Sequence, residues 1–297
     1  MREKTDLTQT AGGITQNTAK SYSRTESQII TDTAQGCIYS FAEDDLMNPQ
    51  YCAGVIVHEI HNALDLENSI RAKGDKMRIP RDLPANVIAL LFSARNDVAL
   101  IAQGIRNTDD GEEDAEFVDK SKLPIAIYQT DGLNKGVWQV CEDAYGIFGE
   151  LVEQYKPSAS KKDKQEVYIS ARNKLRIVRK CVIPHYVAVG NGIVDVKEHK
   201  LLPFSPDIVF TAKIRTNMNL ASVNPVISTP DGDWDVESWM QSLAANEPEL
   251  CNVLWEIIQA ACLPLAPRHK MVMLYSESGN NGKGTLCELI RTEIGRS

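Results

Sequence analysis

Apolar residues in the first third of the chain recur at intervals of three and four, the spacing of a helix with one buried face. Ile56, Ile60, Ala63 and Ile70 predict a first helix of this kind. Pro84 is expected to open a second, longer helix. The buried stripe of that second helix is expected to consist of Val87, Leu90, Leu91, Ala94, Val98, Ile101, Ala102 and Ile105.

The central part of the chain alternates extended and helical patterns. Residues 123–129, LPIAIYQ, are typical of a short strand. Helices are predicted over residues 141–155, 164–180 and 248–263. Residues 186–196 form two β-runs around Asn191-Gly192, a pair that permits positive φ at both turn positions and therefore predicts a β-hairpin. Residues 203–233 contain four prolines and are expected to be rich in loops.

The end of the chain combines three patterns in a fixed order. Residues 270–275, KMVMLY, form a short apolar run, as expected of a buried parallel strand. A glycine-rich turn, GNNGKGT, follows at 279–285, and TLCELIRTEI at 285–294 predicts a helix. Backbone N–H groups in such a turn and at the start of such a helix bind phosphates. The order strand, turn and helix therefore predicts a nucleotide-binding loop.

The predicted loop departs from the usual phosphate-loop pattern at two positions. Glu277 stands where the pattern has glycine, and Gly284 stands where it has a Ser or Thr, so that the hydroxyl moves to Thr285. A flexible Gly/Asn turn in front of a helix is the alternative. The nucleotide-binding residues are expected to be Gly279, Asn280, Asn281, Gly282, Lys283, Gly284 and Thr285. Lys283 would carry positive charge to the outer phosphates.

Several unrelated motifs recur in one order and resemble the phage and plasmid primase–helicase family, which are superfamily III DNA helicases with a poxvirus-type domain before the ATPase. The motifs are VGNGIVDVKEHKLLPFSPDIVFTAKI, Pro225, Trp234, LWEIIQAACLP and LYSESGNNGKGTLCELI. The similarity covers about residues 121–297. Members of this family also carry the GKGT form of the loop.

The resemblance implies a replicative DNA helicase of a phage, plasmid or other mobile element. Such an enzyme binds ATP and Mg²⁺, with Thr285 as the Mg²⁺ ligand, forms a homo-oligomeric ring and acts on DNA in the cytoplasm. The family's Walker B acidic residues, polar sensor, arginine finger and DNA hairpin lie well beyond the loop. Phosphoryl transfer needs these groups together. The chain is therefore expected to be the front portion of a helicase, without ATP hydrolysis of its own.

Together these patterns predict an α+β protein in four parts. Residues 1–36, rich in Thr, Ser, Gln and Gly, are expected to form a disordered arm. A helix-rich N-terminal region at 37–120 ends in an acidic linker. A mixed helical domain with the β-hairpin, the pre-ATPase helicase domain, follows at 121–269. Residues 270–297 would be the first β–α unit of a P-loop, AAA+-like ATPase domain, and this whole segment is expected to be poorly anchored.

The distribution of charge suggests a contact with DNA. The chain has a net charge of −8, yet residues 156–180 contain nine Lys or Arg and two acidic residues, a local net charge of +7. A helical stripe of this kind suits phosphate contacts, and a solvated helix face is the alternative. The candidate DNA-binding residues are Lys161, Lys162, Lys164, Arg172, Arg176, Arg179 and Lys180.

Two other functions are compatible with parts of the sequence. The chain can be a DNA-binding or oligomerisation module of the same family that turns over no nucleotide. A nucleoside-phosphate kinase also carries GKGT, but that class has the loop near its N-terminus. No apolar run reaches the length of about 20 residues that spans a bilayer, so a membrane partner is not expected. Seven scattered cysteines without a pairing pattern fit a reducing cytosol.

Overall fold

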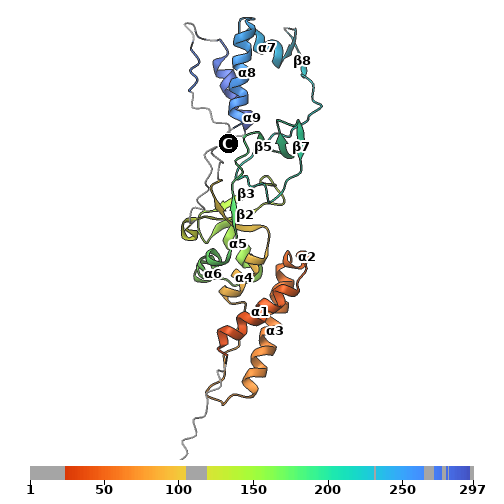
Figure 1. Ribbon diagram of the computed structural model, residues 1–297. Coiled ribbons are helices and arrows are strands. Elements are labelled where there is room, and N and C mark those ends of the chain that lie inside the picture. Colours follow the sequence, from red (N-terminus) through yellow and green to blue (C-terminus); the bar gives the residue numbers. More distant parts are fainter. Residues whose placement is uncertain are drawn as a thin grey trace, which may run out of the picture.

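The computed structural model describes residues 24–104, 119–230, 232–263, 271–275, 279 and 281–294. Its elements form an elongated body with the first helices at one end and the last helices at the other (Figure 1). The helices are α1 (Glu26–Ser40), α2 (Glu43–Leu46), α3 (Pro49–Ser69), α4 (Ala85–Ala94), η1 (Lys120–Lys122), α5 (Gly146–Tyr155), α6 (Lys161–Lys174), α7 (Val236–Leu243), α8 (Pro248–Cys262) and α9 (Lys283–Ile294). The strands are β1 (Val98–Ala102), β2 (Ile125–Tyr128), β3 (Trp138–Cys141), β4 (Ile177–Arg179), β5 (Tyr186–Val189), β6 (Gly192–Asp195), β7 (Lys200–Leu202), β8 (Val226–Thr229) and β9 (Gly232–Asp235). The expected α+β class is confirmed.

A four-stranded sheet in the order β3-β2-β1-β4 organises the first half of the chain. In β1, Leu100 lies opposite Ile125 of the antiparallel strand β2 and opposite Ile177 of the parallel strand β4. All five residues of β1 are buried, as in a central strand whose two faces are both covered. Val98 and Leu100 face the helical core, whereas Ala99 and Ile101 join a smaller cluster around Trp138 on the other face.

The structure corrects the expected long helix over residues 87–105. Helix α4 ends at Ala94, and Val98–Ala102 forms strand β1. Residues 98, 101 and 102 match helical spacing, but an unbroken apolar run of five residues is equally typical of a strand buried on both faces. The pairing of β1 with β2 and β4 decides between the two.

Helix α1 shortens the expected disordered arm. Residues 26–36 belong to this helix, while residues 1–23 lie outside the described part of the chain. Thr25 caps α1 through a reciprocal pair of hydrogen bonds with Gln28, and this capping box satisfies two backbone N–H donors at the helix start. The main core contains Ile29, Ile30 and Ala34 of this helix. The segment is polar on average, but these residues give the helix an apolar face that is buried in the core.

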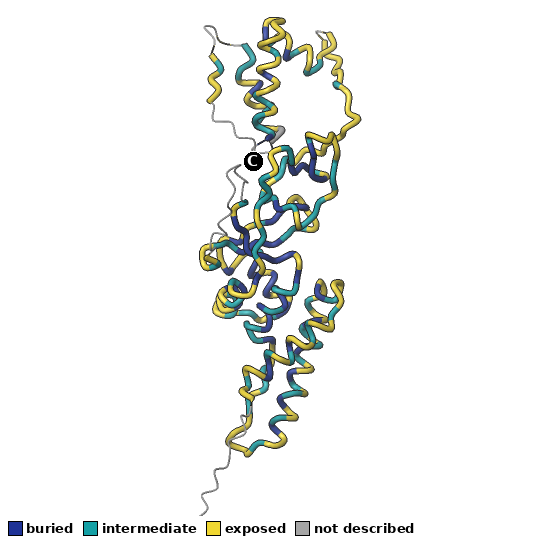
Figure 2. Tube along the Cα trace, in the orientation of Figure 1, coloured by how far each residue is buried: buried dark blue, intermediate teal, exposed yellow. Residues whose placement is uncertain are grey.

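The expected domain boundary at residue 121 falls between β1 and β2, two paired strands of one sheet. One hydrophobic core also joins residues from both sides of that boundary. It contains Phe92 of α4 and Phe148 of α5, whose rings meet edge to face at 5.6 Å between centroids. Figure 2 shows the buried residues concentrated where the sheet meets these helices. The sheet and its helices therefore form one unit that spans residue 121.

The hairpin expected around Asn191 is present. Strands β5 and β6 pair antiparallel, and β7 joins β6 to complete a three-stranded sheet. Val189 lies opposite Gly192, so the two turn residues are Gly190 and Asn191 rather than Asn191 and Gly192. Neither Asn191 nor Gly192 has positive φ. The register is set instead by Val187, Val189 and Val194, which form a small core on one face.

The last helices pack around a separate cluster. Met240 and Ala244 in the α7 region, Leu254 of α8 and Leu286 of α9 are buried together. Strands β8 and β9 form an exposed two-stranded sheet before α7. The helix predicted over residues 248–263 is confirmed as α8, in which Leu254 is buried and Leu250 is exposed. Across the described residues, no helix combines the length and apolar character required to cross a bilayer.

Candidate nucleotide-binding site

One buried side chain anchors the helix that follows the glycine-rich loop. Leu286 is fully buried in the cluster formed by α7, α8 and α9. Ile290, one turn later, packs against the same cluster. The spacing of four residues places both side chains on one face of α9. The helix predicted over residues 285–294 is therefore confirmed, and it begins at Lys283.

Gly282 makes the sharp entry into α9. Its φ of +79° lies in the left-handed region, which disfavours side chains with a Cβ atom. A Cβ atom at this position would lie 2.7 Å from Leu243 Cδ1 of α7. The Gly282 carbonyl accepts a hydrogen bond from the Leu286 backbone N–H at 2.9 Å. The sequence therefore needs glycine here both for backbone geometry and for space.

Lys283 lies at the start of the helix beside the loop. Its Nζ atom donates a hydrogen bond to Asn281 Oδ1 at 2.6 Å, and the side chain is half-buried. Gly284 and Thr285 are exposed on the first turn. The N-terminal turn of a helix carries unpaired N–H groups and partial positive charge, which favour an anion. Lys283 adds a full positive charge at the same end. Gly279 is exposed, and Asn280 lies outside the described residues.

The expected buried strand before the loop is not formed. Residues 271–275 have no regular secondary structure and pair with no strand in the described part of the chain. Met271, Met273 and Tyr275 each expose more than three quarters of their surface, whereas Leu274 packs against the α7–α9 cluster. An apolar run becomes a buried strand only where neighbouring strands supply hydrogen-bond partners. The described residues therefore contain the predicted helix, α9, without the predicted strand before it.

Thr285 alone does not make a magnesium site. Mg²⁺ prefers an octahedron of oxygen ligands, usually one or two carboxylates with phosphate and water oxygens. The described residues contain no group of three or more His, Cys, Asp or Glu side chains suited to a metal ion.

The basic segment does not form the expected helical stripe. Helix α6 ends at Lys174, and Leu175 already has extended backbone with ψ of 146°. Arg176 follows the helix, Arg179 ends strand β4 and Lys180 lies beyond it. Among the candidates Arg172, Arg176, Arg179 and Lys180, only Arg172 lies in the helix. The adjacent β-branched residues Ile177 and Val178 favour a strand, and pairing with β1 stabilises it.

The three arginines of this segment bind backbone carbonyls of the protein. Arg172 Nη2 donates to the Leu123 carbonyl at 2.7 Å, and Arg176 Nη2 donates to the Asn96 carbonyl at 2.7 Å. Arg179 Nη1 makes a longer hydrogen bond, 3.4 Å, to the Gln103 carbonyl. These contacts tie the loops at the ends of β1 and β2 to α6 and β4. These hydrogen bonds give the three arginines a structural role, which explains much of the local excess of positive charge without a DNA contact.

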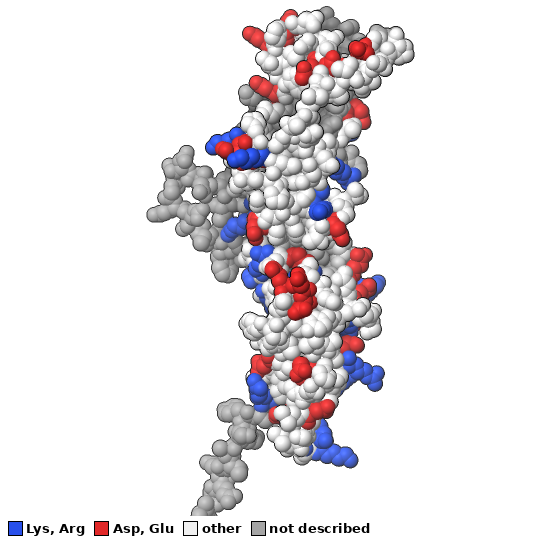
Figure 3. Space-filling view, turned by 90° about the vertical axis from the view of Figure 1, so that its right-hand side faces the viewer, with Lys and Arg blue, Asp and Glu red and all other residues white. Residues whose placement is uncertain are grey.

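The lysines of α6 are also partly neutralised. Lys164 Nζ pairs with Glu153 of α5 at 2.5 Å, and Lys162 lies 3.7 Å from Glu166. Basic and acidic side chains are interspersed on the face seen in Figure 3, without one continuous basic band. Phosphate contacts by this segment would have to compete with these pairs. The solvated-face alternative fits α6 better than a stripe dedicated to DNA.

Replacement of Asp163 by asparagine is expected to make the stability of the protein depend less on pH in the acid range. Asp163 accepts hydrogen bonds from Lys156 Nζ at 2.7 Å and from the Ser160 hydroxyl at 2.6 Å. Lys156, then Ser160, holds the pKa of the Asp163 carboxyl well below its usual value. A carboxyl with a lowered folded-state pKa stabilises the protein above its unfolded pKa, about 3.9, and this contribution is lost as pH falls further.

Thermal unfolding between pH 7 and pH 2 would measure this effect. The melting temperature of Asp163→Asn should be a few degrees below that of the parent at neutral pH and should approach it in acid. Asp207→Asn is the control, because Asp207 is exposed and its carboxylate has no hydrogen-bond partner among the described residues. A difference that stays constant down to pH 2 would show that the Asp163 carboxylate is not responsible.

Two tyrosines in or near the basic segment, Tyr168 and Tyr186, have different environments. Tyr168 is buried against Phe148, with ring centroids 5.1 Å apart, and belongs to the core. Tyr186 is half-buried on β5 and lies beside His185. Tyr186 also borders a cavity of about 790 Å³, the size of a small-molecule site. It is therefore the tyrosine that a bound ligand can reach.

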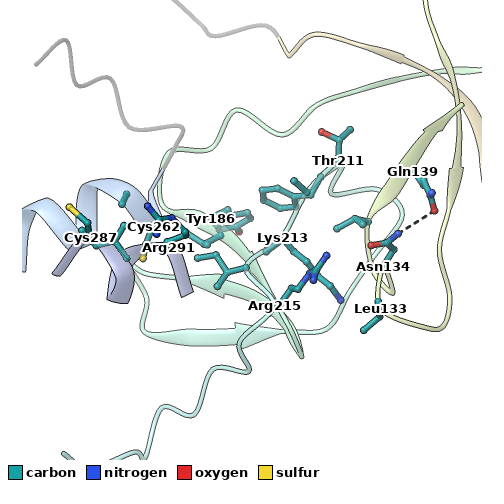
Figure 4. Close-up of a pocket in the computed structure, with 18 residues that line it drawn as sticks. Leu133, Asn134, Gln139, Tyr186, Thr211, Lys213, Arg215, Cys262, Cys287 and Arg291 are labelled. Atoms are coloured by element: carbon teal, nitrogen blue, oxygen red, sulfur yellow. Dashed lines mark hydrogen bonds between the residues drawn. The ribbon is translucent and has the colours of Figure 1, made fainter. Parts of the chain in front are cut away.

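Three basic side chains line this cavity together with Tyr186. Lys213 and Arg215 come from the segment after β7, and Arg291 comes from α9 (Figure 4). The Lys213 Nζ atom donates to the Lys135 carbonyl at 2.6 Å and lies 5.0 Å from the centroid of the Phe204 ring. Burial, followed by the neighbouring charge of Lys135, lowers the pKa of Lys213.

The sequence carried one signal for this cavity. Thr211, Lys213 and Arg215 alternate along residues 211–215, so in an extended segment they share one side. Arg291 comes from the helix behind the phosphate loop, and nothing in its local sequence links it to residues 211–215. The candidate loop, the arginines after α6 and this cavity are three separate features of the described chain. Comparisons of the sequence with protein-family models and with curated proteins found no match.

Proposed function

We propose that this chain is the nucleotide- and DNA-binding front part of a replicative DNA helicase of the phage and plasmid primase–helicase type. The observation that carries the proposal is the GNNGKGT sequence, with Lys283 at the start of the twelve-residue helix α9 and hydrogen-bonded to Asn281. This arrangement suits the phosphates of ATP. The order of motifs in residues 189–290 supports the helicase type.

The residues of the loop would bind ATP through two kinds of group. Backbone N–H groups of the first turn of α9 donate hydrogen bonds to phosphate oxygens. Lys283 exchanges its bond with Asn281 for a charge-assisted bond to an outer phosphate oxygen. Mg²⁺, when bound with ATP, would neutralise phosphate charge and could use Thr285 as one ligand. The described residues contain no group of three or more His, Cys, Asp or Glu side chains suited to a metal ion. In this proposal the loop binds nucleotide, and hydrolysis needs further groups that position the metal and the attacking water.

Replacement of Lys283 by alanine is expected to weaken ATP binding by about tenfold to a hundredfold, because a charge-assisted hydrogen bond contributes about 1.5–3 kcal/mol. Titration with a fluorescent ATP analogue would measure the dissociation constant. Lys161→Ala is a matched control, because Lys161 is also the first residue of a helix but lies outside the loop. Phosphate release should be absent in the parent and in both variants.

Equal ATP affinity in the parent and in Lys283→Ala would contradict the nucleotide-binding role. Absence of ATP binding combined with retained DNA binding would instead support the non-enzymatic module. Turnover of ATP that depends on Lys283 would show that the chain contains a complete catalytic site. The proposed helicase would also form a homo-oligomeric ring. Sedimentation with and without ATP would measure the oligomeric state.

A further inference from the structure

The cavity beside α9, here called the cationic cavity, has walls of a distinct composition. Its ligand-facing side chains include Tyr186, Phe210, Lys213, Arg215, Cys287 and Arg291. No aspartate or glutamate is among the described residues that line it. In a chain of net charge −8, three cations without an acid at one concave surface make a local site for an anion.

The three cations differ in how far they are already occupied. Lys213 donates one hydrogen bond, to the Lys135 carbonyl, and two of its three N–H donors are left for a ligand. Arg215 is exposed and has no hydrogen-bond or ion-pair partner within the described residues. Arg291 pairs with Glu288, but both side chains are more than half exposed. Exposed ion pairs are weak, so a phosphate can displace this one.

The cavity also offers aromatic surface beside the charges. Tyr186 and Phe210 are both half-buried and both contribute to its walls. Figure 4 shows Lys213 and Arg215 between Tyr186 and Asn134, with Arg291 on the side of Cys262 and Cys287. A phosphate next to a planar ring system matches this combination, because aromatic side chains stack on bases and arginines bind phosphate oxygens.

We propose that the cationic cavity binds a nucleotide unit, with its phosphate at Lys213, Arg215 and Arg291 and its base against Tyr186. The site is distinct from the phosphate loop, since Arg291 lies eight residues beyond Lys283, about 12 Å along α9. The proposal rests on the proposed function in one respect only: that the bound nucleotide unit belongs to a single DNA strand. A free mononucleotide has the same chemistry, and the test separates the two sources.

Fluorescence anisotropy of a labelled oligothymidylate, titrated with the full chain at low and moderate salt, tests the site. Arg215→Gln and Arg291→Gln should each weaken binding about tenfold and reduce the slope of log affinity against log salt by about 0.7. Tyr186→Leu should weaken binding to a similar extent without changing that slope, because stacking releases no counterions. Thermal unfolding of each variant reports whether the fold is retained, and exposure of both arginines favours this.

Two controls keep the result specific. Lys73→Gln, at an exposed lysine after α3 and away from the cavity, should leave oligonucleotide affinity unchanged. Lys283→Ala should lose ATP and keep oligonucleotide affinity. If ATP binding fails in the parent but oligonucleotide binding depends on Arg215, the cavity site stands and the nucleotide loop does not.

Competition by thymidine monophosphate distinguishes the sources of the nucleotide. Displacement of the oligonucleotide by the mononucleotide shows that one free unit fills the cavity. Binding that depends on Arg215 and resists such competition identifies the strand as the ligand. Affinity that is unchanged in folded Arg215→Gln and Arg291→Gln overturns the proposal. The proposal is also overturned if neither the oligothymidylate nor thymidine monophosphate binds.

Discussion

Replacement of Arg95 by alanine is expected to lower the free energy of unfolding by about 3–5 kcal/mol. Arg95 and Asp97 are buried polar residues at the turn between α4 and β1. The Arg95 Nε and Nη2 atoms donate to the two Asp97 carboxylate oxygens at 2.8 and 2.5 Å. Removing the guanidinium leaves the Asp97 charge in the core without its partner, and this desolvated charge is the main cost.

A second contact of Arg95 extends the effect beyond the turn. Its Nη1 atom donates to the Tyr155 hydroxyl at 2.9 Å, and that hydroxyl donates to the Leu46 carbonyl at 3.4 Å. The chain of bonds joins the ends of α2, α4 and α5 at the start of β1. Burial raises the pKa of the Tyr155 hydroxyl, so this group stays neutral and keeps its proton for the Leu46 carbonyl.

Urea unfolding followed by circular dichroism and tryptophan fluorescence would measure the loss. Arg176→Ala is the matched control, because Arg176 also donates a side-chain hydrogen bond, to the Asn96 carbonyl, but is exposed. A loss below about 1 kcal/mol is expected there. The double replacement Arg95→Leu with Asp97→Leu should recover part of the loss, since it removes both buried charges. A loss of less than about 1 kcal/mol in Arg95→Ala would show that water solvates Asp97 readily.

The sequence alone predicted those elements whose periodicity has one interpretation. The helices α3, α5 and α8 were predicted because their apolar stripes run over ten residues or more without a competing pattern. The stretch 98–102 was wrongly assigned to a helix because a short, fully apolar run fits both structures. Only its partners β2 and β4, distant in the sequence, decide the outcome. The end of α6 was missed for the same reason, since β4 forms by pairing with β1.

The candidate sites also differ in how far a local sequence pattern could predict them. The nucleotide-binding loop stays a prediction, which the sequence could supply because phosphate binding depends on consecutive backbone groups and one nearby lysine, all contained in residues 279–285. The helical stripe predicted for the basic segment is not formed. A count of charges cannot show that Arg172 and Arg176 bind backbone carbonyls in the fold. The cationic cavity collects side chains from five separate stretches of the chain. No local pattern can bring Arg215 next to α9; tertiary packing does so.

Replacement of Gly136 by alanine is expected to cost about 2–4 kcal/mol of stability and to weaken binding at the cationic cavity. Gly136 has φ of +87°, a conformation that costs residues with a Cβ atom about 1–2 kcal/mol. A Cβ atom there would also lie 2.1 to 2.4 Å from the Cδ1, Cγ and Cε1 atoms of Phe204. Because Cγ itself is overlapped, rotation of the ring about its own axis brings no relief.

The clash would reach the cavity through Lys213. The Phe204 ring supports the Lys213 ammonium at 5.0 Å, and the Lys135 carbonyl, next to Gly136, accepts its hydrogen bond. Moving either the ring or the loop therefore displaces a cation of the proposed site. The Gly136 N–H also donates to the Gln129 carbonyl at 2.7 Å, so the turn between β2 and β3 cannot shift without losing that bond. Loss of stability and loss of oligonucleotide affinity should occur together.

Gly132→Ala separates backbone strain from steric overlap. Gly132 lies in the same turn with φ of +65°, but no atom lies within 4 Å of a Cβ atom built there. This variant should lose only the conformational term of about 1–2 kcal/mol and keep its affinity for the oligonucleotide. Urea unfolding and anisotropy of both variants provide the comparison. If Gly136→Ala loses no more stability than Gly132→Ala, Phe204 moves freely, and the rigid support assigned to Lys213 is wrong.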